Sequence, residues 1–304
     1  MIDTWLAELP HGITLSCRGA GARGRPLMLF LHGFPEAAFV WDALMTHFAQ
    51  PEHGGFRCVA PNLRGFERSS APAEVAAYKP ALMVQDVLAL AAAEGVDGRI
   101  HTLVAHDWGG AFAWAAANAH PARIDHLVII NSPHPATFAR ELQGSAEQQQ
   151  ASAYMNFLAR PDAEALLAED DYRRLWPFFT SMGAGPDRFG WLTEAVRQQY
   201  RDVWRHGLTG ACNLYRVTPL KPPAPGQRGV TGIPLPPPER VRVEVPTLVL
   251  WALDDTALRP GLLDGLDAHV PHLTVQRMPG ATHWVVHEQP QQVAAHISAF
   301  VTSK

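Results

Sequence analysis

The stretch VAHDWGG at residues 104–110 ends an apolar, β-prone run and opens an alanine-rich run at residues 111–119. This order predicts a strand, a sharp turn and a helix, with Asp107 at the tip of the turn. Such a turn strains its middle residue, so the residues two positions before and after it must be small, as Ala105 and Gly109 are. The sequence therefore predicts a carboxylate lifted out of the end of a buried strand.

The carboxylate of Asp107 suggests a nucleophile. An aspartate is already ionised at neutral pH and can attack an electrophilic sp3 carbon directly, whereas a serine must first lose a proton. The free N–H groups at the start of the following helix favour the anion further. Carbon atoms that bear a leaving oxygen or halide suit such a nucleophile. An aspartate that only caps the helix is the alternative interpretation.

Composition and charge exclude several classes of protein. A chain of 304 residues that is 47% hydrophobic can bury a full core. Its net charge of −4 and its pI near 6.4 give no basic surface for nucleic acid or an anionic membrane. Residues 1–5 lack the features of a secretion signal, and no run of about 18 apolar residues predicts a membrane span. Three widely spaced cysteines, Cys17, Cys58 and Cys212, predict free thiols in a reducing compartment, so we expect a cytoplasmic protein.

Alternating strand and helix signals predict an α/β fold with a doubly wound, mostly parallel sheet. Ligands bind such sheets at the carboxyl ends of the strands, and Asp107 lies at one such end. The predicted strands lie at residues 26–31, 56–60, 100–105, 124–130 and 245–251 and from residue 275, and the predicted core helices lie at residues 81–94, 111–119 and 290–301.

The alternation of strand and helix signals stops after residue 135. Apolar and aromatic residues then recur at helical spacing as far as residue 217, which predicts a helical cap inserted over the strand ends. Eight prolines between Pro219 and Pro238 predict an extended connection back to the sheet. The predicted organisation is a first core part at residues 1–135, a helical cap at 136–217, a Pro-rich connecting loop at 218–246 and a second core part at 247–304.

A second loop can lie beside the turn at Asp107. Residues 32–36, HGFPE, follow one of the predicted strands. The backbone N–H groups of Phe34 and Trp108 would then form a two-donor oxyanion hole, whereas Pro35 has no N–H to offer.

Three residues complete a catalytic pattern. Asp107, Asp255 and His283 each follow a predicted strand, and they occur in the order nucleophile, acid, base. This is the chain order of the triad of α/β-hydrolases.

The sequence resembles the α/β-hydrolase superfamily across nearly its whole length. Within it, HGFPE at residues 32–36, HDWGG at 106–110 and NSPHP at 131–135 are similar to motifs of the soluble epoxide hydrolases. The sequence departs from the family at Ala105, where glycine is usual, and alanine is still small enough for the turn.

The acid that pairs with His283 is either Asp255 or Asp254. Asp255 fits the family pattern Asp-x-x-Leu-x-Pro at residues 255–260, and Asp254 is the alternative. Some relatives carry this acid after the strand predicted at residues 124–130, but Asn131 has no charge.

The resemblance also implies two tyrosines in the cap that donate protons to the epoxide oxygen. Tyr154 and Tyr215 match the positions at which the family carries them. Opening an epoxide generates an alkoxide, so an acid is needed opposite the nucleophile, and tyrosine remains protonated at neutral pH. Tyr78, Tyr172 and Tyr200 are expected to be structural.

The implied activity is the hydrolysis of a small apolar epoxide to a vicinal diol in two steps, by a monomer or homodimer, with no metal or organic cofactor. Asp107 attacks an epoxide carbon, and His283 then activates the water that hydrolyses the resulting ester. The residues expected to line the substrate pocket are Phe34, Trp108, Phe157 and Trp284.

Two other functions stay open. A haloalkane or haloacid dehalogenase uses the same Asp-His-Asp chemistry with side-chain N–H donors around the halide, but residue 34 is Phe and the two tyrosines would have no role. A non-catalytic ligand receptor on the same fold has little reason to retain all three triad residues.

Overall fold

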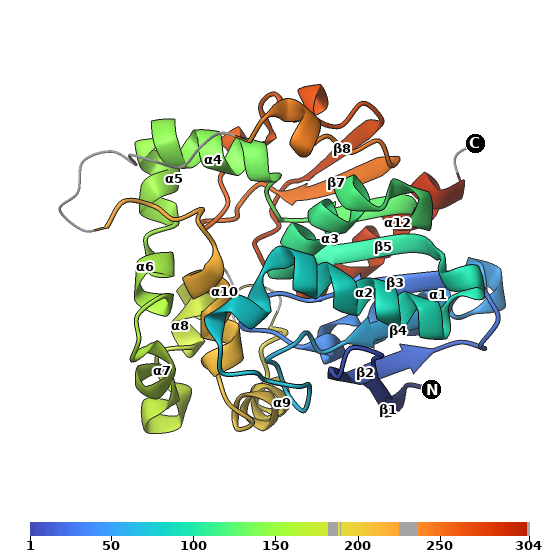
Figure 1. Cartoon of the computed structure of the whole chain (residues 1–304), viewed down its shortest axis with the longest axis horizontal. Helices are drawn as coiled ribbons and strands as arrows, with labels where there is room; N and C mark the ends of the chain where they lie inside the picture. Colours follow the sequence, from blue (N-terminus) through green and yellow to red (C-terminus); the bar gives the residue numbers. More distant parts are fainter. Residues whose placement is uncertain (182–187, 189, 225–235, 303–304) are drawn as a thin grey trace.

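A computed structural model of the chain describes residues 1–181, 188, 190–224 and 236–302. Within these residues the structure holds an eight-stranded sheet with the strand order β1-β2-β4-β3-β5-β6-β7-β8 (Figure 1). All pairings among β3 to β8 are parallel, and β1 and β2 form an antiparallel edge. The strands are β1 (Asp3–Glu8), β2 (Thr14–Ala20), β3 (Leu27–Leu31), β4 (Arg57–Pro61), β5 (Ile100–His106), β6 (Ile124–Ile130), β7 (Thr247–Ala252) and β8 (Leu273–Met278).

The predicted fold class, a mostly parallel and doubly wound α/β sheet, is confirmed. Each parallel strand begins within two residues of its predicted start. β3, β4 and β7 are buried along their whole length, and strands buried on both faces form continuous apolar runs. The apolar patterns in the sequence do not predict β1 and β2. Every residue of β1 is exposed or half-buried, so this edge strand lacks the apolar run that marks the others.

Helices cover both faces of the sheet because successive strand residues point to opposite sides. In β5, Leu103 and Ala105 pack into the cluster that contains α2 and α3, whereas Val104 packs into the cluster that contains α1 and α12. The helices of the core are α1 (Asp42–Phe48), α2 (Pro80–Glu94), α3 (Trp108–Ala119), α11 (Val285–Glu288) and α12 (Pro290–Thr302).

Seven of the described helices lie between β6 and β7 in the chain, and Figure 1 shows them gathered on one side of the sheet. The indole of Trp204 donates a hydrogen bond to the Pro35 carbonyl at 2.8 Å, which joins them to the core. They are α4 (Pro135–Gly144), α5 (Ala146–Ala151), α6 (Tyr154–Leu158), α7 (Ala163–Tyr172), α8 (Trp176–Ser181), α9 (Glu194–Trp204) and α10 (Thr209–Val217).

The predicted Pro-rich connection is described only at its two flanks, since residues 225–235 lie outside the described residues. In the flanks, residues 218–224 and 236–246, the one helical element is the single turn η6 (Pro238–Arg240). None of the helices in the described part of the chain has both the length and the apolar character that crossing a membrane requires.

Two buried ion pairs hold helix α2 against the sheet and its loops. Arg57 of β4 donates to Glu94 at 2.8 and 3.0 Å, and Arg64 donates to Asp86 at 2.6 and 2.9 Å. Arg64 also donates to the carbonyl of Ala77 at 2.7 Å. The four charged residues are at most 6% exposed, so each charge depends on its partner.

Replacing Asp86 with alanine should lower the free energy of unfolding by about 3–5 kcal/mol, because it leaves the buried Arg64 guanidinium without a counter-charge. Urea denaturation measures this loss. Asp162→Ala is the matched control: it removes the partner of the exposed Arg160 and should leave the urea midpoint where it is. Equal midpoints for the Asp86 variant and the wild type would contradict this account of the pair.

Candidate active site

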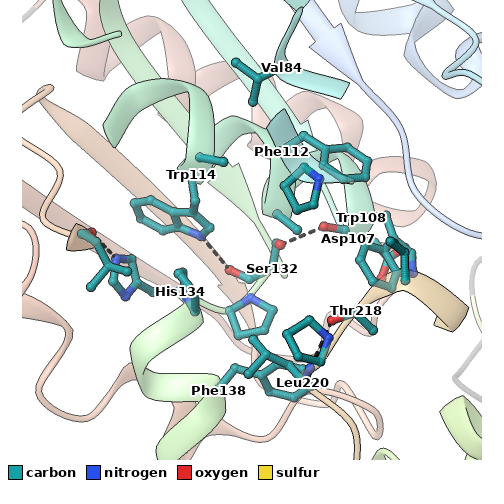
Figure 2. A pocket seen from close by; sticks show the side chains of 18 of the residues that line it. Val84, Asp107, Trp108, Phe112, Trp114, Ser132, His134, Phe138, Thr218 and Leu220 are labelled. Atoms are coloured by element: carbon teal, nitrogen blue, oxygen red, sulfur yellow. Dashed lines mark hydrogen bonds between the residues drawn. The ribbon is translucent and has the colours of Figure 1, made fainter. Parts of the chain in front are cut away.

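Asp107 occupies the turn between β5 and α3 with φ 49° and ψ −121°. A non-glycine residue in such a conformation carries strain of about 1–3 kcal/mol and needs support from its surroundings. The hydroxyl of Ser132 donates to the Asp107 carbonyl oxygen at 2.7 Å, as Figure 2 shows, and the N–H of Ala111 donates to the same oxygen at 3.2 Å. The turn is therefore held by its neighbours in the conformation that exposes the carboxylate.

Glycines allow the loop at residues 32–36 to lie against this turn. A Cβ atom on Gly33 would collide with the Asp107 side chain. A Cβ atom on Gly109 would collide with the backbone carbonyls of Leu31 and His32. Larger residues at either position would push the loop away from the carboxylate.

The structure brings the three triad candidates together. Nδ1 of His283 lies 2.7 Å from Oδ2 of Asp255, and Nε2 of His283 lies 3.8 Å from Oδ2 of Asp107. The other carboxylate oxygen of Asp107 accepts the backbone N–H of Phe34 at 2.7 Å. Trp108, the second candidate for the oxyanion hole, is the first residue of α3, where backbone N–H groups have no partner within the helix.

Asp255 is fully buried and surrounded by hydrogen-bond donors. Its Oδ1 accepts the N–H groups of Ala257 at 2.8 Å and Leu258 at 3.0 Å, and its Oδ2 accepts the side-chain amide of Asn131 at 2.7 Å. Burial alone would raise the pKa of Asp255, but the charge of His283 and these hydrogen bonds outweigh it and lower the pKa. The carboxylate is therefore ionised beside the imidazole.

The alternative acid, Asp254, points elsewhere and pairs with the exposed Arg188 at 3.0 Å. Asn131, noted in the sequence as part of the NSPHP motif and for its lack of charge, also accepts the N–H of Ala252 at 2.9 Å through its Oδ1. Asn131 therefore ties Asp255 to the end of β7. Its place directly after a predicted strand, at the start of the NSPHP motif, was the signal in the sequence for this role.

His283 lies among three carboxylates. Burial lowers its pKa, while the charges of Asp255, Asp107 and Glu36 raise it, so that the pKa of His283 is about 9. Nε2 of His106 lies 2.9 Å from the carbonyl oxygen of His283, and Nδ1 of His106 lies 3.2 Å from Oε2 of Glu36. His106 thus connects the loop of His283 to a second buried acid.

That second acid, Glu36, was identified in the sequence only as part of a loop motif. Its Oε1 accepts the hydroxyl of Tyr200 at 2.9 Å and lies 2.7 Å from Nε2 of His287. Burial opposes its charge, but His287 and His106 lower the pKa of Glu36 well below its usual range. Tyr200, expected to be structural, thereby links α9 to the core across 164 residues of sequence.

A cavity of about 530 Å³ opens over Asp107, and Trp108, Tyr154 and Tyr215 also line it. Burial and the charges of Asp107 and Asp255 raise the pKa of Tyr154, although a hydrogen bond to Tyr215 lowers it in part. Burial, Tyr154 and Asp107 raise the pKa of Tyr215, although a hydrogen bond to Trp108 opposes them. Both hydroxyls therefore stay protonated at neutral pH and can donate to an oxygen in the cavity.

Three of the four side chains expected to line the pocket do not line this cavity. Phe34 is 3% exposed, and its ring packs edge-on against Tyr215 with the centroids 5.3 Å apart. Trp284 is buried behind His283, and the partly buried Phe157 packs against the core. Only the expectation for Trp108 agrees with the lining, because the other three rings pack in or against the hydrophobic core.

Among the described residues, no group of three or more His, Cys, Asp or Glu side chains is arranged to hold a metal ion. The polar groups around Asp107 are instead carboxylates, imidazoles, phenols and backbone N–H groups.

Comparisons with known proteins point to one family. Residues 26–290 match the family model described as the alpha/beta hydrolase fold. Epoxide hydrolase 4 of Mus musculus is 31% identical over 301 residues, which cover 95% of this chain and 77% of the relative.

Two solved structures are similar over almost the whole chain. A structure from work on novel epoxide hydrolases in metagenomes from hot environments is 35% identical, covers 100% of both chains and has a TM-score of 0.87. A variant of the epoxide hydrolase of Bacillus megaterium, in complex with its product (R)-3-[1]naphthyloxy-propane-1,2-diol, is 28% identical, with a TM-score of 0.85 and coverage of 98% of this chain and 100% of that chain.

The geometry predicts that the pKa of His283 depends on the charge of Asp107. Asp107→Asn removes a negative charge that faces the imidazole, so the pKa of His283 should fall below its wild-type value of about 9. NMR titration of the imidazole measures this shift. Asp254→Asn changes a carboxylate that pairs with Arg188 and should leave the pKa of His283 unchanged. An unchanged pKa in the Asp107 variant would mean that the two side chains do not face each other.

Proposed function

Because the chain belongs to the epoxide hydrolase family of the α/β-hydrolase fold, we propose that it opens apolar epoxides to vicinal diols through an ester on Asp107. The observation that carries the mechanism is that one cavity is lined by the carboxylate of Asp107 and by Tyr154 and Tyr215. A nucleophile and two protonated hydroxyls in one cavity are what opening an epoxide requires.

In the first step, Oδ2 of Asp107 attacks one epoxide carbon, and the bond between that carbon and the ring oxygen breaks. Oδ1 remains on the N–H of Phe34, which leaves Oδ2 as the attacking oxygen. The ring oxygen leaves as an alkoxide that accepts a proton from Tyr154 or Tyr215. The products of this step are an ester on Asp107 and a neighbouring hydroxyl group.

In the second step, a water molecule beside Nε2 of His283 attacks the carbonyl carbon of the ester. The imidazole accepts the proton of the water, and Asp255 stabilises the resulting imidazolium. The N–H groups of Phe34 and Trp108 stabilise the oxyanion. The bond between that carbon and the substrate oxygen then breaks, and the diol takes the proton from His283. Asp107 is left as a carboxylic acid, and its proton returns to the tyrosinate formed in the first step, which regenerates both residues.

Formation of the ester prepares His283 for this second role. The ester removes the charge of Asp107, one of the carboxylates that raise the pKa of His283. The pKa of the imidazole therefore falls when the intermediate forms, and a larger fraction is neutral and able to accept a proton at neutral pH.

The cavity and a relative both support an apolar substrate with an aryl group. Aromatic side chains of the cavity, among them Phe112 and Phe138, border the space beyond Asp107. The Bacillus megaterium relative is found with a naphthyloxy-propanediol as its product. Aryl-bearing terminal epoxides such as styrene oxide are therefore the first substrates to test.

The proposed organisation keeps the four parts at residues 1–135, 136–217, 218–246 and 247–304. It is supported by the run of helices α4 to α10 between β6 and β7. Cys17, Cys58 and Cys212 are free and buried, which supports the proposal that the enzyme works in a reducing compartment, the cytoplasm.

The variant His283→Gln should accumulate the ester, because Asp107 can still attack but no base activates water. Intact-protein mass spectrometry after incubation with styrene oxide should show an increase equal to the mass of one epoxide. The double variant Asp107→Asn with His283→Gln is the control and should show no adduct. An adduct on the double variant would place the nucleophile elsewhere.

Replacing one cavity tyrosine, in Tyr154→Phe or Tyr215→Phe, should lower kcat/KM for styrene oxide by about tenfold, and the double replacement by about a hundredfold or more, because a proton donor contributes factors of this size. Chromatographic measurement of the diol tests this. Tyr172→Phe, outside the described cavity, should keep wild-type activity. Halide release from haloalkanes that is as fast as diol formation and insensitive to both replacements would favour a dehalogenase instead.

A further inference from the structure

The cavity over Asp107 does not end at the two tyrosines. It continues along helix α3 and reaches Asn118, Ala119 and His120 at the far end of that helix. Ala111 and His120 are nine residues apart, which at 1.5 Å per residue gives this part of the cavity a length of about 14 Å. We name the part of the cavity from Ala111 to His120 the α3 groove. One end of this groove is therefore the proposed nucleophile.

Small side chains of α3 leave the groove open. Ala111, Ala115 and Ala119 are spaced by four residues, so they lie on one face of the helix, and all three line the cavity. They are half-buried or exposed, whereas Ala113 and Ala116 on the other faces are fully buried in the core. A leucine at any of the three positions would fill space that is empty now.

The walls of the groove are mainly apolar. Figure 2 shows Val84 and Phe112 on one side of the cavity and Phe138 and Leu220 on the other. Such walls bind hydrocarbon, and burying each methylene group of a chain there favours binding.

The Pro-rich connection contributes one wall. Residues from both of its described flanks line the cavity, including Leu220 and Val241. The flank after the loop is anchored, because Asn118 donates to the carbonyl of Arg242 at 2.7 Å and Nε2 of His134 lies 2.8 Å from the carbonyl oxygen of Val241. At the far end the lining turns polar, with Asn118, His120 and Arg240.

From this continuity we infer that the preferred substrates are elongated terminal epoxides whose hydrocarbon chain lies along the α3 groove. The inference rests on the proposed epoxide hydrolysis and specifies its substrate class. The epoxide carbon lies at Asp107, the chain passes over Ala115, and its end reaches the polar mouth at Asn118, His120 and Arg240. Ala115 and Ala119 are then specificity-determining residues, because their small size sets how far a chain can extend.

The experiment measures kcat/KM for diol formation with unbranched terminal epoxides from four to twelve carbons, with styrene oxide beside them. For the wild type, kcat/KM should rise by about fourfold for each added methylene, as expected for its burial, until the chain reaches the polar far end of the groove. Two variants then place obstacles at different depths. In both variants kcat/KM should stop rising once the substrate chain reaches the new leucine. Because residue 115 lies nearer to Asp107 than residue 119 does, the rise should stop at a shorter chain in Ala115→Leu than in Ala119→Leu.

Ala93→Leu is the matched control, since it adds the same side chain at an exposed position of α2 outside the described cavity, and it should retain the wild-type profile. If the wild type hydrolysed styrene oxide but kcat/KM did not rise along the alkyl series, this inference would be wrong and the proposed function would stand. The same would hold if kcat/KM stopped rising at the same chain length in both groove variants. If the wild type hydrolysed none of the epoxides, both would fall.

Discussion

The site depends on a backbone conformation that an aspartate does not adopt without support. Asp107 lies at positive φ on the turn between β5 and α3, and this is what turns its carboxylate away from the sheet. The support comes from three neighbouring residues. Gly33 and Gly109 allow close packing around the turn, and the hydroxyl of Ser132 donates to the Asp107 carbonyl oxygen. Contacts from the loop after β3, from α3 and from the loop after β6 thus balance the strain at Asp107. They hold the carboxylate within hydrogen-bond distance of the Phe34 N–H.

A second constraint is the number of buried charges around one imidazole. Asp255 and Glu36 are buried acids whose charges are kept by hydrogen bonds and by neighbouring histidines. They raise the pKa of His283 together with Asp107, the one carboxylate whose charge changes during the proposed reaction. Forming the ester removes a charge that holds the proton on the imidazole, so the first step of the proposed reaction lowers the pKa of the base that the second step needs.

The shape of the cavity relates the site to the rest of the fold. Helix α3 begins at the nucleophile, and its alanine face continues the cavity along the helix. The same helix therefore stabilises the turn at one end and forms the floor of the groove along its length. The inserted helices and the flanks of the Pro-rich connection add the opposing wall, so that the helices and loops of the core, the insertion and the connection all contribute to one cavity.

The sequence by itself determined the parallel strands, the turn at Asp107 and the order of nucleophile, acid and base, because these follow from local patterns of apolar, small and charged residues. Local patterns left Asp254 and Asp255 as alternatives and did not predict the exposed edge strand β1 or its largely buried neighbour β2. Glu36 stood out in the sequence only as part of the HGFPE motif at residues 32–36. Only the tertiary structure decided that Asp255 faces His283, that Tyr200 donates to Glu36, and that Phe157 and Trp284 lie outside the lining of the cavity. The physical reason is that the direction of a side chain depends on packing between segments far apart in the chain, which no local pattern records.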